Sequence, residues 1–489
     1  MALLKWGDYR PDTSDYEGTS VHAIQNVLPR GDGYGPFPSF AAYSQGLPAT
    51  CRGAFYALKS DGSVITFAGT ATKLYQLNNT NFGWTDVSKA AGSYSGLSAN
   101  AQWQFAQFGN LVFATQANAP LQVFDLSSAS AFADCAGSPP QAAYVSVVGR
   151  FLVLSGLLSQ PYRIQWSGLN ATTTWTSGVS SSDFQDFPDG GIVRGVAGGE
   201  YGIIFQDQAI RRMSYIPGSP LIFQIDRMTQ DKGLFAPYSI VRAGEKIFFY
   251  AGQGFHKIEP GGVPEQIGRE KVDRTFIADF DKGHLELFIG AADPRSTKVY
   301  WAYRSVNGVN PANYDKMLGY DYVLDRWFTI SVTGEFLVGI SQSGLTLENL
   351  DTISSSIDAL TLSLDSYATA VQPQIAQFNA LTHVLGFFAG TPLEATLESA
   401  EQAADGRRVT LRGFQPITDA TTLYGSVTYR DTQASNQILG DEVAMNTRTG
   451  RCDMMRDARY IRYKNRIPAG SNWTYAIGVE PDVTTNGAV

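Results

Sequence analysis

The stretch Lys298–Val332 reads KVYWAYRSVNGVNPANYDKMLGYDYVLDRWFTISV, and it predicts three consecutive antiparallel strands. Val299–Tyr303 is rich in aromatic side chains, and Met317–Tyr322 alternates in the period of a strand with one buried face. A tight turn at Asp325-Arg326 leads into Trp327–Val332, which alternates in the same way. Because a single meander cannot bury both of its faces, this unit requires neighbours of the same kind.

Looser copies of the unit occur upstream, each with a strand, a glycine turn and a second, apolar strand. Their turns are Asp61-Gly62-Ser63, Gly109-Asn110, Gly149-Arg150, Gly198-Gly199-Glu200 and Gly244-Glu245. The spacing of roughly 40–52 residues is typical of four-stranded propeller blades. We therefore predict an all-β fold with a β-propeller of about six blades, one more or one fewer being compatible with the pattern. A run of unrelated hairpins in a sandwich is the alternative.

The chain divides into four segments by composition. Residues 1–48 alternate proline and glycine and predict an extended N-terminal arm that lies along its own body or reaches a neighbouring subunit. Residues 49–345 would form the propeller, and residues 346–374, rich in Ser, Thr, Asp and Leu, would form a linker. Alternating strands return over residues 375–489, which predict a C-terminal antiparallel β domain, a β-sandwich.

Composition agrees with an all-β protein and limits its function. Among 489 residues, 12% are aromatic, 17% are charged and 49 are glycine. The net charge of −8 argues against an ordinary nucleic-acid-binding protein but not against one that lets DNA slide past. Cys51, Cys135 and Cys452 are too scattered for a disulfide framework, so we expect three buried thiols. We expect no secretory signal, no membrane insertion and folding in a reducing cytoplasm.

No residue pattern predicts catalysis or a cofactor. The four histidines lack metal-ligand spacing with a cysteine or with each other, and they are His22, His256, His284 and His383. Asp183, Asp186 and Asp189 could serve glycoside chemistry, but they lie in a Ser/Gly/Pro loop where aspartate commonly caps turns. The sequence therefore predicts a protein that is not an enzyme and that holds no cofactor or metal.

Basic residues gather on one predicted strand near the C-terminus. Arg462, Lys464 and Arg466 should share one strand face with nothing apolar between them. One interpretation is a solvated face paired with acidic residues on the adjacent strand. The other is a surface that docks an acidic partner or contacts a passing DNA backbone.

Several short motifs follow one another along nearly the whole chain. They are Asn26-Val27-Leu28-Pro29, Gly33-Tyr34-Gly35-Pro36-Phe37-Pro38, Gly149-Arg150-Phe151, Arg163-Ile164-Gln165-Trp166-Ser167, Tyr320-Asp321-Tyr322, Asp325-Arg326-Trp327, Leu385-Gly386-Phe387-Phe388, Leu393-Glu394-Ala395-Thr396-Leu397-Glu398 and Arg466-Ile467-Pro468-Ala469-Gly470. In this order they resemble the β-propeller tail hub or nozzle (tail tube B-like) proteins of short-tailed bacteriophages. The motifs are degenerate and structural, and the family offers no catalytic residue to carry over.

The resemblance implies a structural virion protein of the phage tail, made in the cytoplasm of the bacterial host. Such subunits form a homo-hexameric ring below the head-to-tail adaptor, continue the DNA ejection channel and anchor tail fibres or spikes. The partners implied are other copies of the chain, the adaptor, the fibres or spikes, and passing genomic DNA that is not bound by sequence. A net-acidic ring agrees with this role because it repels the DNA backbone.

Two alternative functions remain, and the first belongs to another class. A carbohydrate-binding or carbohydrate-degrading propeller, such as an adhesin or depolymerase, could stack sugars on exposed aromatics such as Trp84, Trp175 or Trp301. A fibre or baseplate attachment protein of a longer tail is disfavoured because coiled-coil heptads and collagen-like repeats are absent from the sequence.

Overall fold

The computed structural model describes residues 3–14, 16, 18–90, 92–341, 356, 373–403 and 407–485. In this part of the chain the strands form nine antiparallel sheets, so the predicted all-β class is confirmed. The described helical elements are α1 (Asp273–Asp279) and two 3-10 turns, η1 (Pro237–Ser239) and η2 (Leu285–Leu287). Nearly all of the predicted linker, residues 346–374, lies outside the described residues.

Seven sheets have four strands each, and six of them are built from consecutive strands. These six are β6 (Ala54–Leu58), β7 (Val64–Gly69), β8 (Leu74–Leu77) and β9 (Trp84–Asp86); β10 (Gln104–Phe108), β11 (Leu111–Thr115), β12 (Gln122–Asp125) and β13 (Ala133–Asp134); β14 (Ala142–Val148), β15 (Phe151–Leu157), β16 (Arg163–Trp166) and β17 (Asp183–Asp186); β18 (Val193–Ala197), β19 (Gly202–Gln206), β20 (Ile210–Tyr215) and β21 (Phe223–Thr229); β22 (Val241–Ala243), β23 (Lys246–Tyr250), β24 (Phe255–Ile258) and β25 (Glu265–Gln266); β26 (Ile289–Asp293), β27 (Lys298–Tyr303), β28 (Lys316–Asp321) and β29 (Arg326–Ile330).

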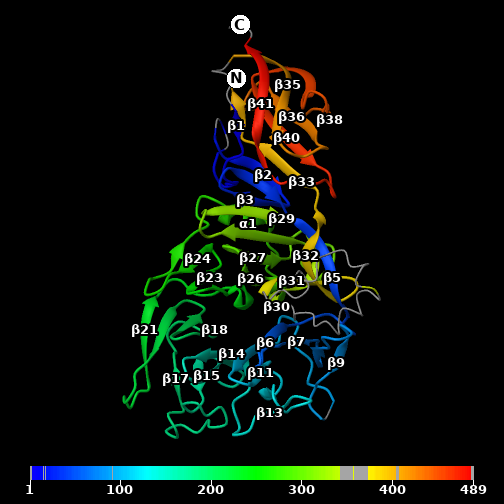
Figure 1. Cartoon of the computed structure of the whole chain (residues 1–489). Helices are drawn as coiled ribbons and strands as arrows, with labels where there is room; N and C mark the ends of the chain where they lie inside the picture. Colours follow the sequence, from blue (N-terminus) through cyan, green and yellow to red (C-terminus); the bar gives the residue numbers. More distant parts are fainter. Residues whose placement is uncertain are drawn as a thin grey trace.

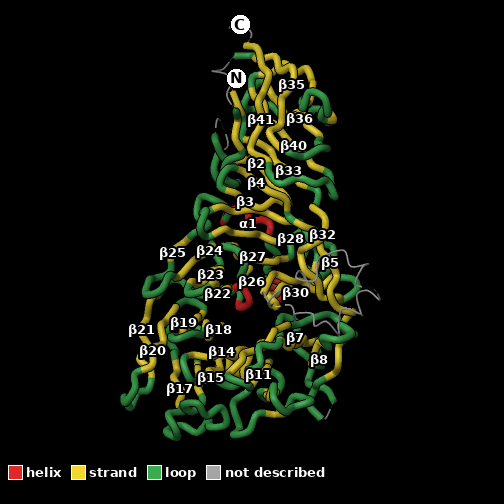
Figure 2. Tube along the Cα trace, viewed as in Figure 1, coloured by secondary structure: helices red, strands yellow, loops and turns green. Residues whose placement is uncertain are grey.

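The seventh four-stranded sheet combines distant segments of the chain. It is formed by β30 (Gly334–Ser341), β31 (Pro373–Asn379), β32 (Val384–Pro392) and β5 (Pro38–Gly46). Successive sheets share apolar cores, and β30 contacts β6, so that the last sheet meets the first. Figure 2 shows the sheets around a common axis, the arrangement of a β-propeller.

The predicted meander is confirmed as β27, β28 and β29, with β26 as a fourth strand. The expectation that only one face would be buried is wrong, because five of the six residues of β28 are buried. In a propeller each sheet packs against a neighbour on both faces. Within the sheet, Gly319 leaves room for its cross-strand partner on β29, because a Cβ atom at this position would lie 2.2 Å from the ring of Phe328.

The predicted hairpins with glycine turns also occur, as the first two strands of their sheets. Gly109, Gly149 and Gly244 have φ values of 59°, 55° and 62°, which lie in the left-handed region that favours glycine. The glycine turns that define the sequence repeat therefore have the backbone conformation that favours glycine.

The remaining strands form two larger sheets that join both ends of the chain. The six-stranded sheet contains β3 (Val27–Arg30), β4 (Gly33–Pro36), β41 (Ala476–Thr485), β35 (Val409–Thr418) and β39 (Cys452–Ala458), with β1 (Leu4–Lys5) on β41. The seven-stranded sheet contains β2 (Val21–Gln25), β33 (Ala395–Ser399), β40 (Tyr460–Ile467), β36 (Tyr424–Arg430) and β37 (Ile438–Leu439), with β34 (Gln402–Ala403) on β40 and β38 (Val443–Ala444) on β36.

The predicted segment boundaries differ from sheet membership at both ends. The arm, residues 1–48, lies along its own body, but as strands β1 to β5 within three sheets. The boundary at residue 375 falls inside β31, which pairs with β30 of the propeller. Both differences have one cause: unpaired strand edges were completed by segments far away in sequence. The two larger sheets stand at the outer edge of the propeller, where β2 and β3 contact β29 (Figure 1).

Candidate functional site

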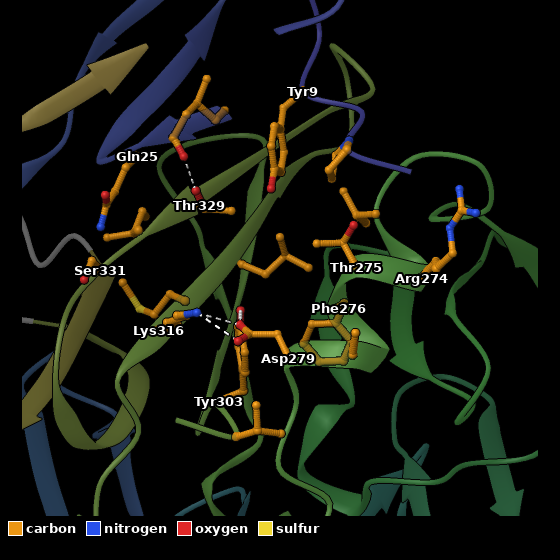
Figure 3. Close-up of a pocket in the computed structure, with 18 of the residues that line it drawn as sticks. Tyr9, Gln25, Arg274, Thr275, Phe276, Asp279, Tyr303, Lys316, Thr329 and Ser331 are labelled. Atoms are coloured by element: carbon orange, nitrogen blue, oxygen red, sulfur yellow. Dashed lines mark hydrogen bonds and ion pairs between the residues drawn. The ribbon is translucent and has the colours of Figure 1, made fainter. Parts of the chain in front are cut away.

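A cavity of about 750 Å³ lies where the N-terminal segment meets the propeller. Its walls come from the segment around Tyr9, from β2, from α1 and from β28 and β29 (Figure 3). It therefore lies at the junction between the larger sheets and the propeller, a place where ligand sites commonly occur.

An ion pair occupies one wall of the cavity. Lys316 Nζ lies 2.9 and 2.8 Å from the two carboxylate oxygens of Asp279, the last residue of α1. The Tyr303 hydroxyl donates a third hydrogen bond to the same carboxylate, at 2.9 Å. Burial and the Asp279 charge raise the pKa of Tyr303, so this phenol remains a donor at neutral pH.

Tyr9 faces this ion pair from the N-terminal segment, with its hydroxyl directed into the cavity (Figure 3). Among the described residues that hydroxyl has no hydrogen-bond partner. Burial, with smaller contributions from the charges of Asp12 and Asp279, raises the pKa of Tyr9 to about 12. The Tyr9 hydroxyl is therefore protonated at physiological pH and available to a ligand.

Asp12 holds the N-terminal segment against α1. Its carboxylate accepts hydrogen bonds from the backbone N–H groups of Arg274 and Thr275, at 2.7 and 2.8 Å. The N-cap residue of α1, Val272, makes no side-chain cap, so a residue far away in sequence caps the helix instead. This contact fixes one side of the cavity.

Asp273, buried at the start of α1, should give the protein a measurable pH dependence. Burial raises the pKa of Asp273 to about 6, although Phe255 N–H and Gln266 donate hydrogen bonds to its carboxylate. Because this pKa lies above that of the unfolded chain, near 3.8, the folded state holds the proton longer. Stability from this group is thus present at pH 4 and lost as pH rises through 6.

Replacing this carboxyl with an amide tests that dependence. We expect the unfolding free energy of the wild type, relative to Asp273→Asn, to fall by up to about 3 kcal/mol between pH 4 and pH 7. Urea unfolding at several pH values measures this difference. A difference that rises with pH would mean that the hydrogen bonds, not burial, dominate at Asp273.

Three segments that precede the first strands of their sheets contact one another. The Tyr238 hydroxyl accepts a hydrogen bond from Gln102 N–H at 2.9 Å, and Gln102 Nε2 donates to the backbone carbonyl of Glu286 at 2.7 Å. These residues precede β10, β22 and β26, the first strands of their sheets. A cavity of about 300 Å³, lined in part by Tyr144 and Arg194, remains beside them. This space is far too small for a DNA duplex.

The predicted basic face exists on β40, but two of its three cations are engaged. Arg462 is 5% exposed and donates to Gln437 at 2.9 Å. Arg466 forms ion pairs with Glu394 and Glu442 at 3.0 and 2.8 Å. Lys464 makes no ion pair within 4 Å among the described residues. The structure therefore brings the three residues together, and Lys464, whose charge acts on Glu442 without an ion pair in the described ranges, is the least engaged of them.

Reversing the charge of Lys464 tests the docking role without breaking the fold. We expect Lys464→Glu to change the unfolding free energy by no more than about 0.5 kcal/mol. If β40 docks an acidic partner, the same variant should weaken assembly in mass photometry. Arg466→Glu is the contrasting variant, because it sets a carboxylate against Glu394 and Glu442 and should destabilise the fold by about 1 kcal/mol. Equal destabilisation by both variants would assign β40 a purely structural role.

The other singled-out polar residues have local partners. Asp183 accepts from Ser177, Asp186 pairs with Arg163, and Asp189 pairs with Arg211. His284 and His383 contact Glu286 and Glu335. Within the described residues, no group of three His, Cys, Asp or Glu side chains could hold a metal ion. The three cysteines are buried free thiols, as expected.

Two of the three tryptophans named for the alternative of sugar stacking are buried, so this alternative is wrong for Trp175 and Trp301. Trp301 is 0% and Trp175 is 5% exposed, each within an apolar core. Trp84 is half-buried, and its indole N–H donates to the backbone carbonyl of Gln45 at 2.9 Å. Large aromatics fill the spaces between sheets because they bury the most apolar area.

Sequence reasoning missed the cavity residues. Tyr9, Asp279 and Lys316 come from three separate segments, and no local motif joins them. No sequence signal could have grouped them, because their proximity depends on long-range packing.

No helix within the described ranges has the length and apolar character needed to cross a membrane.

No family model matches the chain, and no curated protein matches it. A solved structure described as YCF48 bound to D1 peptide is similar at 14% identity over 49% of this chain and 70% of that chain, with a TM-score of 0.30. A second, described as the extracellular domain of a one-component system from B. thetaiotaomicron, is similar at 11% identity over 85% of this chain and 47% of that chain, with a TM-score of 0.36. The chain thus matches about half the length of the second.

Proposed function

We propose that this chain is a structural, non-enzymatic subunit of a short-tailed phage tail nozzle or hub. In this role it forms a homo-hexameric ring below the head-to-tail adaptor, continues the DNA ejection channel and anchors fibres or spikes. The observation that carries the proposal is the edge-on junction of β2 and β3 with β29, tied by the Asp12 cap on α1. This contact joins the propeller and the two larger sheets into one elongated body (Figure 1). In the proposed ring, the long sides of this body contact the neighbouring subunits.

We infer that the seven four-stranded sheets are seven blades, the upper end of the expected range, with β5 completing the last blade. We also infer that the two larger sheets form a sandwich. Phe414 on β35 and Tyr463 on β40 support this, because their rings from opposite sheets lie 5.5 Å apart. A Cβ atom at Gly425 on β36 would lie 2.7 Å from Cys452 Sγ on β39, which also indicates close facing sheets.

The channel in this proposal lies between copies and not along the propeller axis. The cavity of about 300 Å³ that the first strands of several sheets line is too small for a DNA duplex, so DNA would pass outside each propeller. A ring of six identical subunits uses a heterologous interface that closes on itself. The net charge of −8 on each chain would keep the DNA backbone from adhering to the wall.

Electron microscopy of negatively stained protein, with mass photometry on the same sample, tests the proposal. We expect six-fold rings at about six times the monomer mass, either alone or after addition of the adaptor, with the central opening between subunits. A strictly monomeric species under both conditions would contradict the ring. An opening that coincides with each propeller axis would contradict the placement of the channel.

A further inference from the structure

We infer that the junction cavity beside Tyr9 binds a neutral saccharide. This inference goes beyond the proposed structural role and does not depend on it. It places the sugar site in this cavity, which no tryptophan lines, and not at the buried tryptophans.

Each charged side chain that lines the cavity already has a partner within the protein. Of its lining residues, Asp279 and Lys316 neutralise each other at 2.8 Å. The other lining cation is Arg274. Its backbone N–H donates to the Asp12 carboxylate, and its guanidinium donates to the main-chain carbonyl of Asp12. A charged ligand that recruits Asp279 or Lys316 would have to break their ion pair, whereas a neutral ligand would not.

The groups left for a ligand are hydroxyls and amides. Tyr9, Gln25, Asn307 and Ser331 line the cavity, and their side chains have no hydrogen-bond partner within the described ranges. Figure 3 shows Tyr9 directed inward, with Gln25 and Ser331 at the left of the view. Hydroxyls and amides both donate and accept hydrogen bonds, as the hydroxyl groups of a sugar also do.

The rest of the lining suits the apolar faces of sugar rings. Ile24, Leu318 and Ile330 line the cavity beside the ring of Tyr9. An aromatic side chain with a polar end can pack on ring C–H groups while its hydroxyl contacts the ligand. The volume of about 750 Å³ lies within the range of small-molecule sites.

The same geometry indicates binding without cleavage. Glycoside hydrolysis commonly uses two carboxyl groups about 5–10 Å apart, one on each side of the bond. Asp279 is the single carboxylate among the lining residues, and Lys316 and Tyr303 occupy its oxygens. The ligand should therefore leave the site unchanged.

Screening the full chain on an array of neutral and acidic oligosaccharides provides the first test. Maltotriose, cellotriose and mannotriose serve as neutral probes, and oligosaccharides containing sialic or glucuronic acid serve as acidic probes. We expect at least one neutral probe to bind and the acidic probes not to bind. Failure of every neutral probe, repeated by saturation-transfer NMR at millimolar ligand, would overturn the inference, as would preference for acidic probes.

Point variants then locate the binding. We expect Tyr9→Phe and the exposed Gln25→Ala each to weaken binding of the best neutral probe about tenfold in calorimetry, since each removes hydrogen bonds to the ligand. Tyr162→Phe and Gln208→Ala are matched controls at exposed positions outside the cavity and should bind normally. Unchanged binding by both cavity variants would overturn the inference. Ring assembly, recorded for every variant, reports separately on the proposed function.

Discussion

Replacing Trp301 with alanine is expected to destabilise the propeller by about 3–5 kcal/mol, a large part of the stability of a typical domain. Trp301 is fully buried, and its ring lies 5.9 Å from Trp327 and 4.7 Å from Phe255 of the neighbouring sheet. Its indole N–H donates to the Ser239 carbonyl at 2.9 Å, so the variant also leaves a buried acceptor unpaired. Urea unfolding, or the yield of soluble protein, measures the effect.

Trp84→Ala is the matched control, because Trp84 is half-buried at the outer strand β9. Its ring lies 5.9 Å from Phe378, and we expect about half the destabilisation or less. A soluble, stable Trp301→Ala protein that has lost glycan binding would contradict the structural role of Trp301. It would restore the interpretation of this residue as a sugar platform.

The local part of the fold could be predicted because the alternation of a strand and the residues of a turn both depend on neighbouring positions in the sequence. Gly109, Gly149 and Gly244 mark hairpins whose positive φ only glycine adopts readily, and each occurs where expected. The alternation in β28 likewise identified a strand. It could not reveal that both faces are buried, because burial depends on the sheets that pack on each side.

The distant pairings could not be predicted in the same way. Phe40 on β5 pairs with Phe388 on β32, and no short-range pattern records which sheet edge an extended N-terminal segment will complete. Helix α1 gave little signal because its seven residues are capped by Asp12 from the other end of the chain. The junction cavity depends on both of these long-range contacts, so it became visible only in the folded chain.

The second large effect on stability is expected at Glu335, whose carboxylate contacts two other segments of the chain. Glu335 lies at the start of β30 with its side chain 2% exposed, where the last propeller sheet meets the first. One carboxylate oxygen accepts Cys51 N–H at 2.9 Å, and the other lies 2.5 Å from His383 Nδ1. Cys51 precedes β6 and His383 precedes β32, so one side chain joins the two ends of the ring.

We expect Glu335→Ala to destabilise the protein by about 3 kcal/mol, because it leaves a buried N–H and the His383 ring without an acceptor. The exposed Glu200→Ala should change stability by no more than about 0.5 kcal/mol. A double-mutant cycle with His383→Ala, followed by urea unfolding, separates the pair from the Cys51 contact. If Glu335→Ala matched Glu200→Ala, the carboxylate would not close the ring.

Glu335→Gln adds a pH test of the same contact. Burial raises the pKa of Glu335, against the opposing effects of Cys51 N–H and His383. A carboxyl pKa raised by folding means that the folded state holds a proton which the unfolded chain has released. The contribution of Glu335 to stability is therefore greatest below about pH 4.5 and declines as pH rises through the raised value. The wild type should accordingly lose stability relative to Glu335→Gln over that window, and the opposite slope would show that the His383 contact outweighs burial.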